Sequence, residues 1–123
     1  MTSALRRTLS EPTRPMEQPS FLKLADECLE TVANWLEPFD PDEVDFGTTD
    51  GVVAIEFPDG TKYIVNRQTA TDQMWFAAGV RAWHYDRAAD GRWLCDRDGH
   101  DLYGRISEVV SEKLGRKAGP IVR

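Results

Sequence analysis

The sequence lacks the features that mark several common functional classes. No apolar run approaches the ~20 residues that cross a bilayer, and we expect no membrane partner. The start MTSALRRTLSEP lacks the apolar segment of a secretory signal peptide, and no glycine-rich phosphate loop is present. Cys28 and Cys95 form no Cys-x-x-Cys pair and no Cys/His run at zinc spacing. We expect free thiols in a reducing compartment, with a disulfide or a catalytic thiol as alternatives.

Histidine is equally scarce and indicates no catalytic residues. Neither His84 nor His100 has a Ser, Cys or second His placed beside it to indicate a triad or a metal pair, so we expect structural or surface roles. The stretch 96–101 begins like a calcium loop, but the twelfth position counted from Asp96 is Ser107, where an EF-hand requires Glu. A turn followed by a helix cap explains this stretch better.

Basic residues are missing from one long stretch of the chain. The net charge of −6 argues against a nucleic-acid partner. Between Leu24 and Thr61 there are eleven acids and no Lys or Arg, whereas the rest of the chain has 10 acids and 15 bases. The eleven acids, here called the acidic block, are Asp26, Glu27, Glu30, Glu37, Asp40, Asp42, Glu43, Asp45, Asp50, Glu56 and Asp59.

The composition supports one folded domain preceded by a tail. The chain has 123 residues, 41% of them hydrophobic, which is enough to bury a core. Residues 1–19 contain three prolines and no apolar period, so they are predicted to be a disordered tail. We expect a cytoplasmic bacterial protein; the early Arg and Ser residues are also typical of an organellar transit peptide, which leaves the mitochondrial matrix as the alternative.

The local patterns predict a helix, a series of short strands and a second helix. The first helix runs from a Ser20 cap to about Glu37, and the second is opened by Asp98 or Asp101 and ended by Gly115. Short hairpin links predict an antiparallel sheet of five to seven strands, and both helices must bury an apolar stripe on it. The fold class is therefore α+β, a two-layer α-β sandwich. The strands are predicted near 44–46, 52–57, 61–68, 73–78, 83–85 and 92–95.

The first helix is predicted to separate its acids from its apolar residues. At 100° per residue its four acids fall within an arc of about 100°, opposite the apolar face. Four acids of the following loop and strand continue the negative field. The ordinary interpretation is a solvated face, but unpaired like charges cost ~0.2–0.5 kcal/mol per pair, which favours a surface for a cation or a basic partner. Carboxylates suit Ca²⁺, Mn²⁺, Fe²⁺ or Fe³⁺ rather than Cu(I), and an open face binds such ions weakly.

A second candidate site lies on the predicted sheet. Strand alternation places Asn66 and Gln68 on one face, and Gln73 and Trp75 on the face opposite the core. An exposed Trp beside three amides is typical of a protein interface. The alternative is that Trp75 lies at a sheet edge and packs under a loop.

Several segments, taken in order, resemble the frataxin/CyaY family over residues 21–114. The specific part is the Asn-Arg-Gln strand followed by Gln-x-Trp. The segments are LADE at 24–27, DGVV at 50–53, YIVNRQ at 63–68, QMWFA at 73–77, YD at 85–86, Trp93 and DG at 98–99.

The resemblance implies a frataxin-like domain at 20–116 with a loose tail at 117–123. It implies a non-enzymatic, iron-binding (Fe²⁺/Fe³⁺) regulator of iron–sulfur cluster biogenesis that contacts a cysteine desulfurase and a cluster scaffold. A ferroxidase or iron-storage protein, and a metal-independent docking module, remain alternatives. We expect a monomer, with iron-dependent oligomers as the alternative.

Carried over by position, the resemblance assigns two sets of site residues. One departure is Leu22, which stands where some bacterial relatives have a histidine; another is that Pro38 and Pro41 interrupt a denser acidic run. The implied partner-binding residues are Asn66, Gln68, Gln73 and Trp75. The implied metal-binding acidic ridge consists of Asp26, Glu27, Glu30, Glu37, Asp40, Asp42, Glu43 and Asp45.

Overall fold

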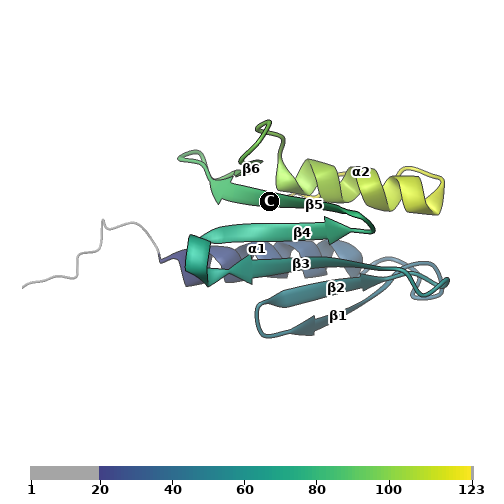
Figure 1. Cartoon of the computed structure of the whole chain (residues 1–123). Helices are drawn as coiled ribbons and strands as arrows, with labels where there is room; N and C mark the ends of the chain where they lie inside the picture. The colour runs from purple at the N-terminus through teal and green to yellow at the C-terminus, as the bar shows by residue number, and fades with distance from the viewer. Residues whose placement is uncertain (1–19, 123) are drawn as a thin grey trace, which may run out of the picture.

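The structure is a computed structural model that describes residues 20–122. The predicted disordered tail at 1–19 lies outside the described residues. Along the chain, one helix precedes six strands and a second helix follows them (Figure 1). The elements are α1 (Phe21–Leu36), β1 (Asp45–Thr49), β2 (Val52–Glu56), β3 (Lys62–Gln68), η1 (Thr69–Thr71), β4 (Gln73–Ala78), β5 (Arg81–Arg87), β6 (Trp93–Cys95) and α2 (Leu102–Leu114).

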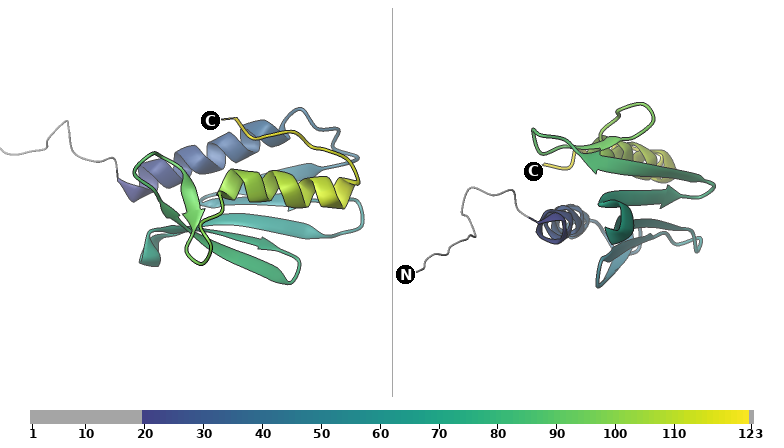
Figure 2. Two further views of the ribbon diagram at one scale, coloured as in Figure 1. Left: turned by 90° about the horizontal axis from the view of Figure 1, so that it is seen from above. Right: turned by 60° about the vertical axis from the view of Figure 1, so that its left-hand side comes forward.

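The strands form one antiparallel sheet in which each strand pairs with its neighbour in sequence, in the order β1-β2-β3-β4-β5-β6. Both helices lie on the same face of this sheet, and the opposite face carries no helix (Figure 2). The predicted two-layer α+β sandwich is therefore confirmed. Within residues 20–122, neither helix is long and apolar enough to span a membrane.

Helix α1 has its acids and its apolar side chains on opposite sides, as the pattern predicts. Ser20 caps it, because its hydroxyl accepts the backbone N–H of Lys23 at 3.3 Å. Its last residue is Leu36, with Glu37 as the C-cap. The buried residues of α1 are Ala25, Cys28, Leu29, Val32 and Leu36.

The first hairpin differs from its prediction. The first strand was expected near 44–46, but β1 continues through Thr49, which pairs with Val52. The turn is only Asp50-Gly51, with Gly51 at φ +78, because an Asp-Gly pair suits a two-residue hairpin loop. This shorter turn brings Asp50 close to α1.

The segment after α2 was expected to be loose, and this expectation is wrong. It has no helix or strand, but the Ser107 hydroxyl donates to the Gly119 carbonyl at 2.6 Å, and the Ala118 N–H donates to the Ser111 hydroxyl at 2.9 Å. The Ile121 side chain is only 9% exposed. The segment turns back along the helices (Figure 2), because burying one Ile recovers apolar area that α1 and α2 leave uncovered.

The core contains both cysteines as free thiols, as expected. Tyr85 is also buried, and its hydroxyl lies 2.7 Å from Nε2 of His100. Burial raises the pKa of Tyr85 far above its ordinary value, so the phenol stays protonated. His100 therefore satisfies a buried hydroxyl, which agrees with the structural role expected for it.

Candidate functional site

The acidic block covers one side of α1 and the loop that follows it. Asp26, Glu27, Glu30 and Glu37 are exposed on α1, opposite the side that packs on the sheet. The loop continues this surface with exposed Asp40 and Asp42. The helix thus presents a carboxylate surface to solvent.

A base from the sheet reaches into this surface. The guanidinium of Arg67, on β3, donates to Asp26 at 2.8 Å and to Asp50 at 3.1 Å. The Arg67 side chain is 18% exposed, so one arginine joins α1, β3 and the first hairpin. The acids of the block were expected to be unpaired, and for these two the expectation is wrong.

Three more acids of the block also have basic partners. Arg116, just beyond α2, pairs with Glu43, and Lys113 in the last turn of α2 pairs with Asp59. The hydrogen bond from Lys113 holds the pKa of Asp59 well below its ordinary range. Glu27 pairs locally with Lys23 at 2.6 Å. Except for Lys23, these bases lie far away in sequence, so a charge count along the chain could not show them.

We call Asp26, Asp50, Glu43 and Asp59 the anchored carboxylates, since each pairs with a base from a distant part of the chain. We call Glu30, Glu37, Asp40 and Asp42 the open carboxylates. Within residues 20–122, no Lys, Arg or His group pairs with an open carboxylate. They are the part of the surface that remains available to an external cation.

Glu37 occupies an unfavourable position at the C-terminal end of α1. It is the C-cap, and the last turn of α1 carries no basic residue. The C-terminal end of a helix is the negative end of its dipole, so a carboxylate there lowers stability and a cation raises it. The loop that follows adds Asp40, whose carboxylate accepts the Asp42 N–H at 2.9 Å. This end of α1 therefore concentrates negative potential.

Asp45 does not lie with the rest of the predicted acidic ridge. It opens β1 opposite Glu56 of β2. Its neighbour Phe46 packs against the core, so strand alternation turns Asp45 to the face without helices. The other seven predicted metal residues lie along α1 and its following loop.

Asp50 belongs to the acidic block but was not among the residues of the predicted acidic ridge. The structure instead puts it in one hollow with Asp26 and Glu30, between α1 and the first hairpin. The Asp-Gly pair is the signal that could have located it, because a two-residue loop fixes which way the turn residue lies.

The geometry of the acidic ridge suits loosely held, hydrated ions. Within residues 20–122, no three ridge carboxylates place their oxygens within 4.8 Å of one another. The donors are nevertheless hard oxygens, of the kind that bind Fe²⁺, Mn²⁺ or Ca²⁺. An ion here would keep several waters and contact one or two carboxylates at a time.

The four predicted partner-binding residues come together on the sheet face that carries no helix. Asn66 of β3 stands opposite Trp75 of β4, and Gln68 stands opposite Gln73. The indole N–H of Trp75 donates to Gln73 at 3.1 Å. Trp75 is half-buried, and its ring stacks on His84 with centroids 4.2 Å apart and planes at 17°. The residues form a polar surface around one fixed aromatic ring.

Three further side chains belong to this surface and were missed. The Gln73 amide donates to Asp86 at 3.1 Å and to Asp96 at 3.2 Å, and His84 stacks on Trp75. Alternation in β5 is the signal that could have found two of them, since Trp83 and Tyr85 are buried and the residues between and after them face outward.

Comparisons with known proteins agree with this fold. A frataxin of Psychromonas ingrahamii matches with a TM-score of 0.71 and 28% identity over 79% of this chain and 90% of that chain. A trimeric frataxin from the yeast Saccharomyces cerevisiae, complexed with ferrous, matches with a TM-score of 0.67 and 27% identity over 84% of this chain and 94% of that chain. The model of the frataxin-like domain matches residues 14–116. The chain belongs to the frataxin/CyaY family.

Proposed function

We propose that this protein is an iron-binding regulator of iron–sulfur cluster assembly that docks on a cysteine desulfurase and on a cluster scaffold. The observation that carries the proposal is the set of open carboxylates, Glu30, Glu37, Asp40 and Asp42, on the exposed side of a frataxin-family domain. The yeast relative complexed with ferrous supports iron as the cation.

Iron binding is assigned to the open carboxylates rather than to the whole acidic ridge. Asp26 and Glu43 already have arginine partners, so an incoming cation must compete with a guanidinium there. At Glu37, Asp40 and Asp42 it meets no such competitor among residues 20–122 and also relieves the repulsion at the end of α1. Binding is weak and exchangeable, which suits a protein that hands iron on.

Docking uses two surfaces on opposite layers of the sandwich. The open carboxylates provide a negative field that attracts a basic partner surface, and this attraction weakens with salt. The sheet face around Trp75 provides a rigid aromatic anchor with amides at its rim, a common composition for an interface centre. One acidic surface thereby serves both iron and a protein partner.

A ferroxidase is not what we propose, although it was an alternative from the sequence. Di-iron oxidation sites of the ferritin type enclose two ions with inward-facing Glu and His ligands on packed helices. Most of the acidic ridge is solvent-exposed, and within the described residues its carboxylates form no cluster of three.

Fe²⁺ titration under anaerobic conditions tests the iron assignment. We expect paramagnetic broadening of backbone NMR signals to centre on residues 37–42 and then reach Glu30, with Mg²⁺ as the diamagnetic control. If signals around Asp26 and Glu43 broaden first while 37–42 stay sharp, the assignment to the open carboxylates is wrong.

Pull-down with a purified cysteine desulfurase and a cluster scaffold tests docking. The first variant reverses Glu30, Asp40 and Asp42 to Lys, and the second is Trp75→Ala. We expect the first to lose the desulfurase at low salt and the second to lose the scaffold. A pair of variants that both retain both partners would refute the docking proposal and leave iron binding to be judged by NMR.

A further inference from the structure

The turn between β6 and α2 gathers three side chains that commonly bind metals. Cys95, Asp98 and His100 place one ligand atom each within 4.8 Å of one another, and they are the one such group in residues 20–122. They come from a Cys-x-x-Asp-x-His stretch. This stretch lacks the usual zinc spacing of cysteine and histidine, because an aspartate stands where a second cysteine would complete Cys-x-x-Cys.

The backbone of this turn holds the three residues together. The N–H of Cys95 donates to the His100 carbonyl at 2.8 Å, and the N–H of Gly99 donates to the Cys95 carbonyl at 2.9 Å. Gly99 has φ +77, a conformation that glycine adopts without strain. A closed turn therefore fixes the ligand positions before any ion arrives, which lowers the entropy lost on binding.

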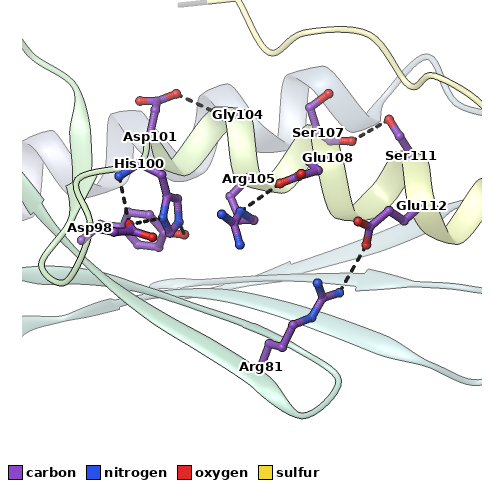
Figure 3. A network of polar contacts seen from close by, with 11 residues as sticks. Arg81, Asp98, His100, Asp101, Gly104, Arg105, Ser107, Glu108, Ser111 and Glu112 are labelled. Atoms are coloured by element: carbon purple, nitrogen blue, oxygen red, sulfur yellow. Dashed lines mark hydrogen bonds and ion pairs between the residues drawn. The ribbon is translucent and has the colours of Figure 1, made fainter.

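The side chains converge from the core to the surface. The Cys95 residue is 5% exposed, the His100 side chain 17% and the Asp98 side chain 63%. Nδ1 of His100 lies 2.5 Å from the Asp98 carboxylate, and Figure 3 shows these two side chains together at the start of α2. An ion can therefore enter past Asp98 and reach the thiol beneath it.

The second nitrogen of His100 is already held in place. Its Nε2 lies 2.7 Å from the buried hydroxyl of Tyr85. Metal-bound histidines usually donate their other ring N–H to an oxygen, which fixes the tautomer and the ring orientation. In the metal-free state the 2.5 Å contact with the Asp98 carboxylate requires the ring proton on Nδ1. Zinc binding therefore requires the other tautomer, with the ring proton on Nε2 and the Tyr85 oxygen as its acceptor, which leaves the Nδ1 lone pair for the ion.

From this geometry we propose that Cys95, Asp98 and His100 bind a Zn²⁺ ion, distinct from the iron bound by the open carboxylates. Thiolate, imidazole and carboxylate are the three ligand types that zinc uses in proteins, and a site with three protein ligands completes its tetrahedron with water. Thiolate and carboxylate together balance the charge of the ion. On binding, the thiol proton of Cys95 passes to solvent.

The rearrangement required is small. Zinc bond lengths of ~2.0–2.3 Å imply ligand atoms roughly 3.3–3.6 Å apart in a tetrahedron. Asp98 and His100 must therefore separate from 2.5 Å, and the wider pairs of the group must close from at most 4.8 Å. Rotation of the exposed Asp98 side chain supplies most of this movement.

Co²⁺ is the probe for the test, because it occupies zinc sites and its thiolate bond produces a charge-transfer absorption band. We expect the full-length, metal-free protein to develop this band with saturation at one equivalent, and one equivalent of Zn²⁺ to remove it. A spectrum without the band in excess Co²⁺ would overturn the proposal.

Matched variants locate the site. Cys95→Ser should abolish the band, whereas Cys28→Ser, at the other buried cysteine, should leave it unchanged. Asp98→Asn and His100→Gln keep polar side chains that can still form hydrogen bonds at the turn, and each should weaken Co²⁺ binding at least about tenfold. Circular dichroism confirms folding, and wild-type affinity in these two variants would contradict the proposal even if Cys95→Ser fails to fold.

Two further variants test whether Tyr85 only orients His100 and whether the acidic ridge takes part in Co²⁺ binding. Tyr85→Phe should weaken Co²⁺ binding on the order of tenfold while the thiolate band persists, because Tyr85 orients His100 and does not touch the ion. Glu37→Gln should leave both the band and the affinity unchanged. If Glu37→Gln weakens Co²⁺ binding as much as Asp98→Asn does, the cation is bound by the acidic ridge and the zinc proposal is wrong.

Discussion

The anchored and the open carboxylates belong to the same acidic block, yet they do different work. Anchored Asp26, Asp50, Glu43 and Asp59 pair with bases 17 to 73 positions away and so connect α1, the loops and the sheet to one another. Open Glu30, Glu37, Asp40 and Asp42 pair with no base within residues 20–122. The anchored carboxylates therefore stabilise the fold through ion pairs, whereas the open carboxylates add negative charge without forming such pairs.

The unpaired charge of the open carboxylates lowers the stability of the fold, and this makes a functional explanation for it testable. Like charges at helical spacing repel, and an acid at a helix C-terminus opposes the dipole. The anchored carboxylates remove much of their own repulsion by pairing. If the open carboxylates serve an external cation, their removal should weaken binding and strengthen the fold, whereas removal of the anchored ones should do the reverse.

The largest expected effect comes from two matched triple variants. Neutralising three open carboxylates (Glu30→Gln, Asp40→Asn, Asp42→Asn) should weaken Fe²⁺ binding at least tenfold, more than about 1.4 kcal/mol. Neutralising three anchored ones (Asp26→Asn, Asp50→Asn, Glu43→Gln) changes the net charge equally. Isothermal titration with Fe²⁺ under anaerobic conditions gives both affinities.

The anchored triple variant should bind Fe²⁺ within about threefold of the wild-type protein, because guanidinium groups already occupy those carboxylates. Its melting temperature should fall, whereas that of the open triple variant should rise. Equal losses of affinity in the two variants would mean that only the total charge matters, and the distinction between the two groups would fail.

The next effect concerns the arginine that joins two anchored acids. A Cβ added at Gly51 would lie 3.0 Å from the Arg67 guanidinium, and Gly51 has φ +78. Gly51→Ala should therefore lower the free energy of unfolding by about 1 kcal/mol from the backbone alone, with an additional loss from displacing Arg67. Urea unfolding measures the total.

Gly79→Ala is the matched control for this substitution. Gly79 also has a positive φ, +66, but nothing lies within 4 Å of an added Cβ, so it reports the backbone cost alone. The excess loss in Gly51→Ala measures the contribution of Arg67 to holding α1 on the hairpin. If the two variants lose the same stability, Arg67 is not an anchor.

Most of the fold followed from local patterns. The apolar spacing of α1, the capping Ser20 and the closing Gly115 each act within a few residues, so the sequence shows them directly. The alternation of β4 correctly placed Gln73 and Trp75 on the face opposite the core, and Met74 and Phe76 between and after them are buried. The short 50–51 turn and the packed C-terminal segment were missed, because both depend on contacts with other elements.

The site was less predictable for the same reason. The acids of α1 could be assigned to one face, but their partners Arg67 and Arg116 come from β3 and from beyond α2. The Cys95 group was missed because a search limited to Cys and His overlooks a carboxylate ligand. The sequence shows where acidic residues are concentrated, but only the tertiary contacts show which of these acids pair with a base.

A smaller effect is expected at one open carboxylate. Glu37 caps the C-terminal end of α1, where a negative charge is unfavourable. Glu37→Gln should raise the free energy of unfolding by about 0.3–1 kcal/mol at low salt, and the gain should shrink at high salt. Thermal unfolding at two salt concentrations checks this, with Glu27→Gln, which loses its Lys23 partner, as a control expected to gain nothing.

The smallest expected effect is a pH-dependent change in melting temperature at one anchored carboxylate, Asp59. Lys113 holds the folded-state pKa of Asp59 below its ordinary range, so the pair stabilises the fold above the unfolded pKa of ~3.9, and this contribution is lost as pH falls through the folded pKa. The melting temperature of Asp59→Asn should therefore lie below that of the wild-type protein near neutral pH, and the gap should begin to narrow as the pH falls below about 4. A gap that stays constant down to pH 2 would show that the difference comes from the turn at Asp59, whose carboxylate also accepts the Thr61 N–H. In that case Lys113 does not anchor this end of the acidic block to α2.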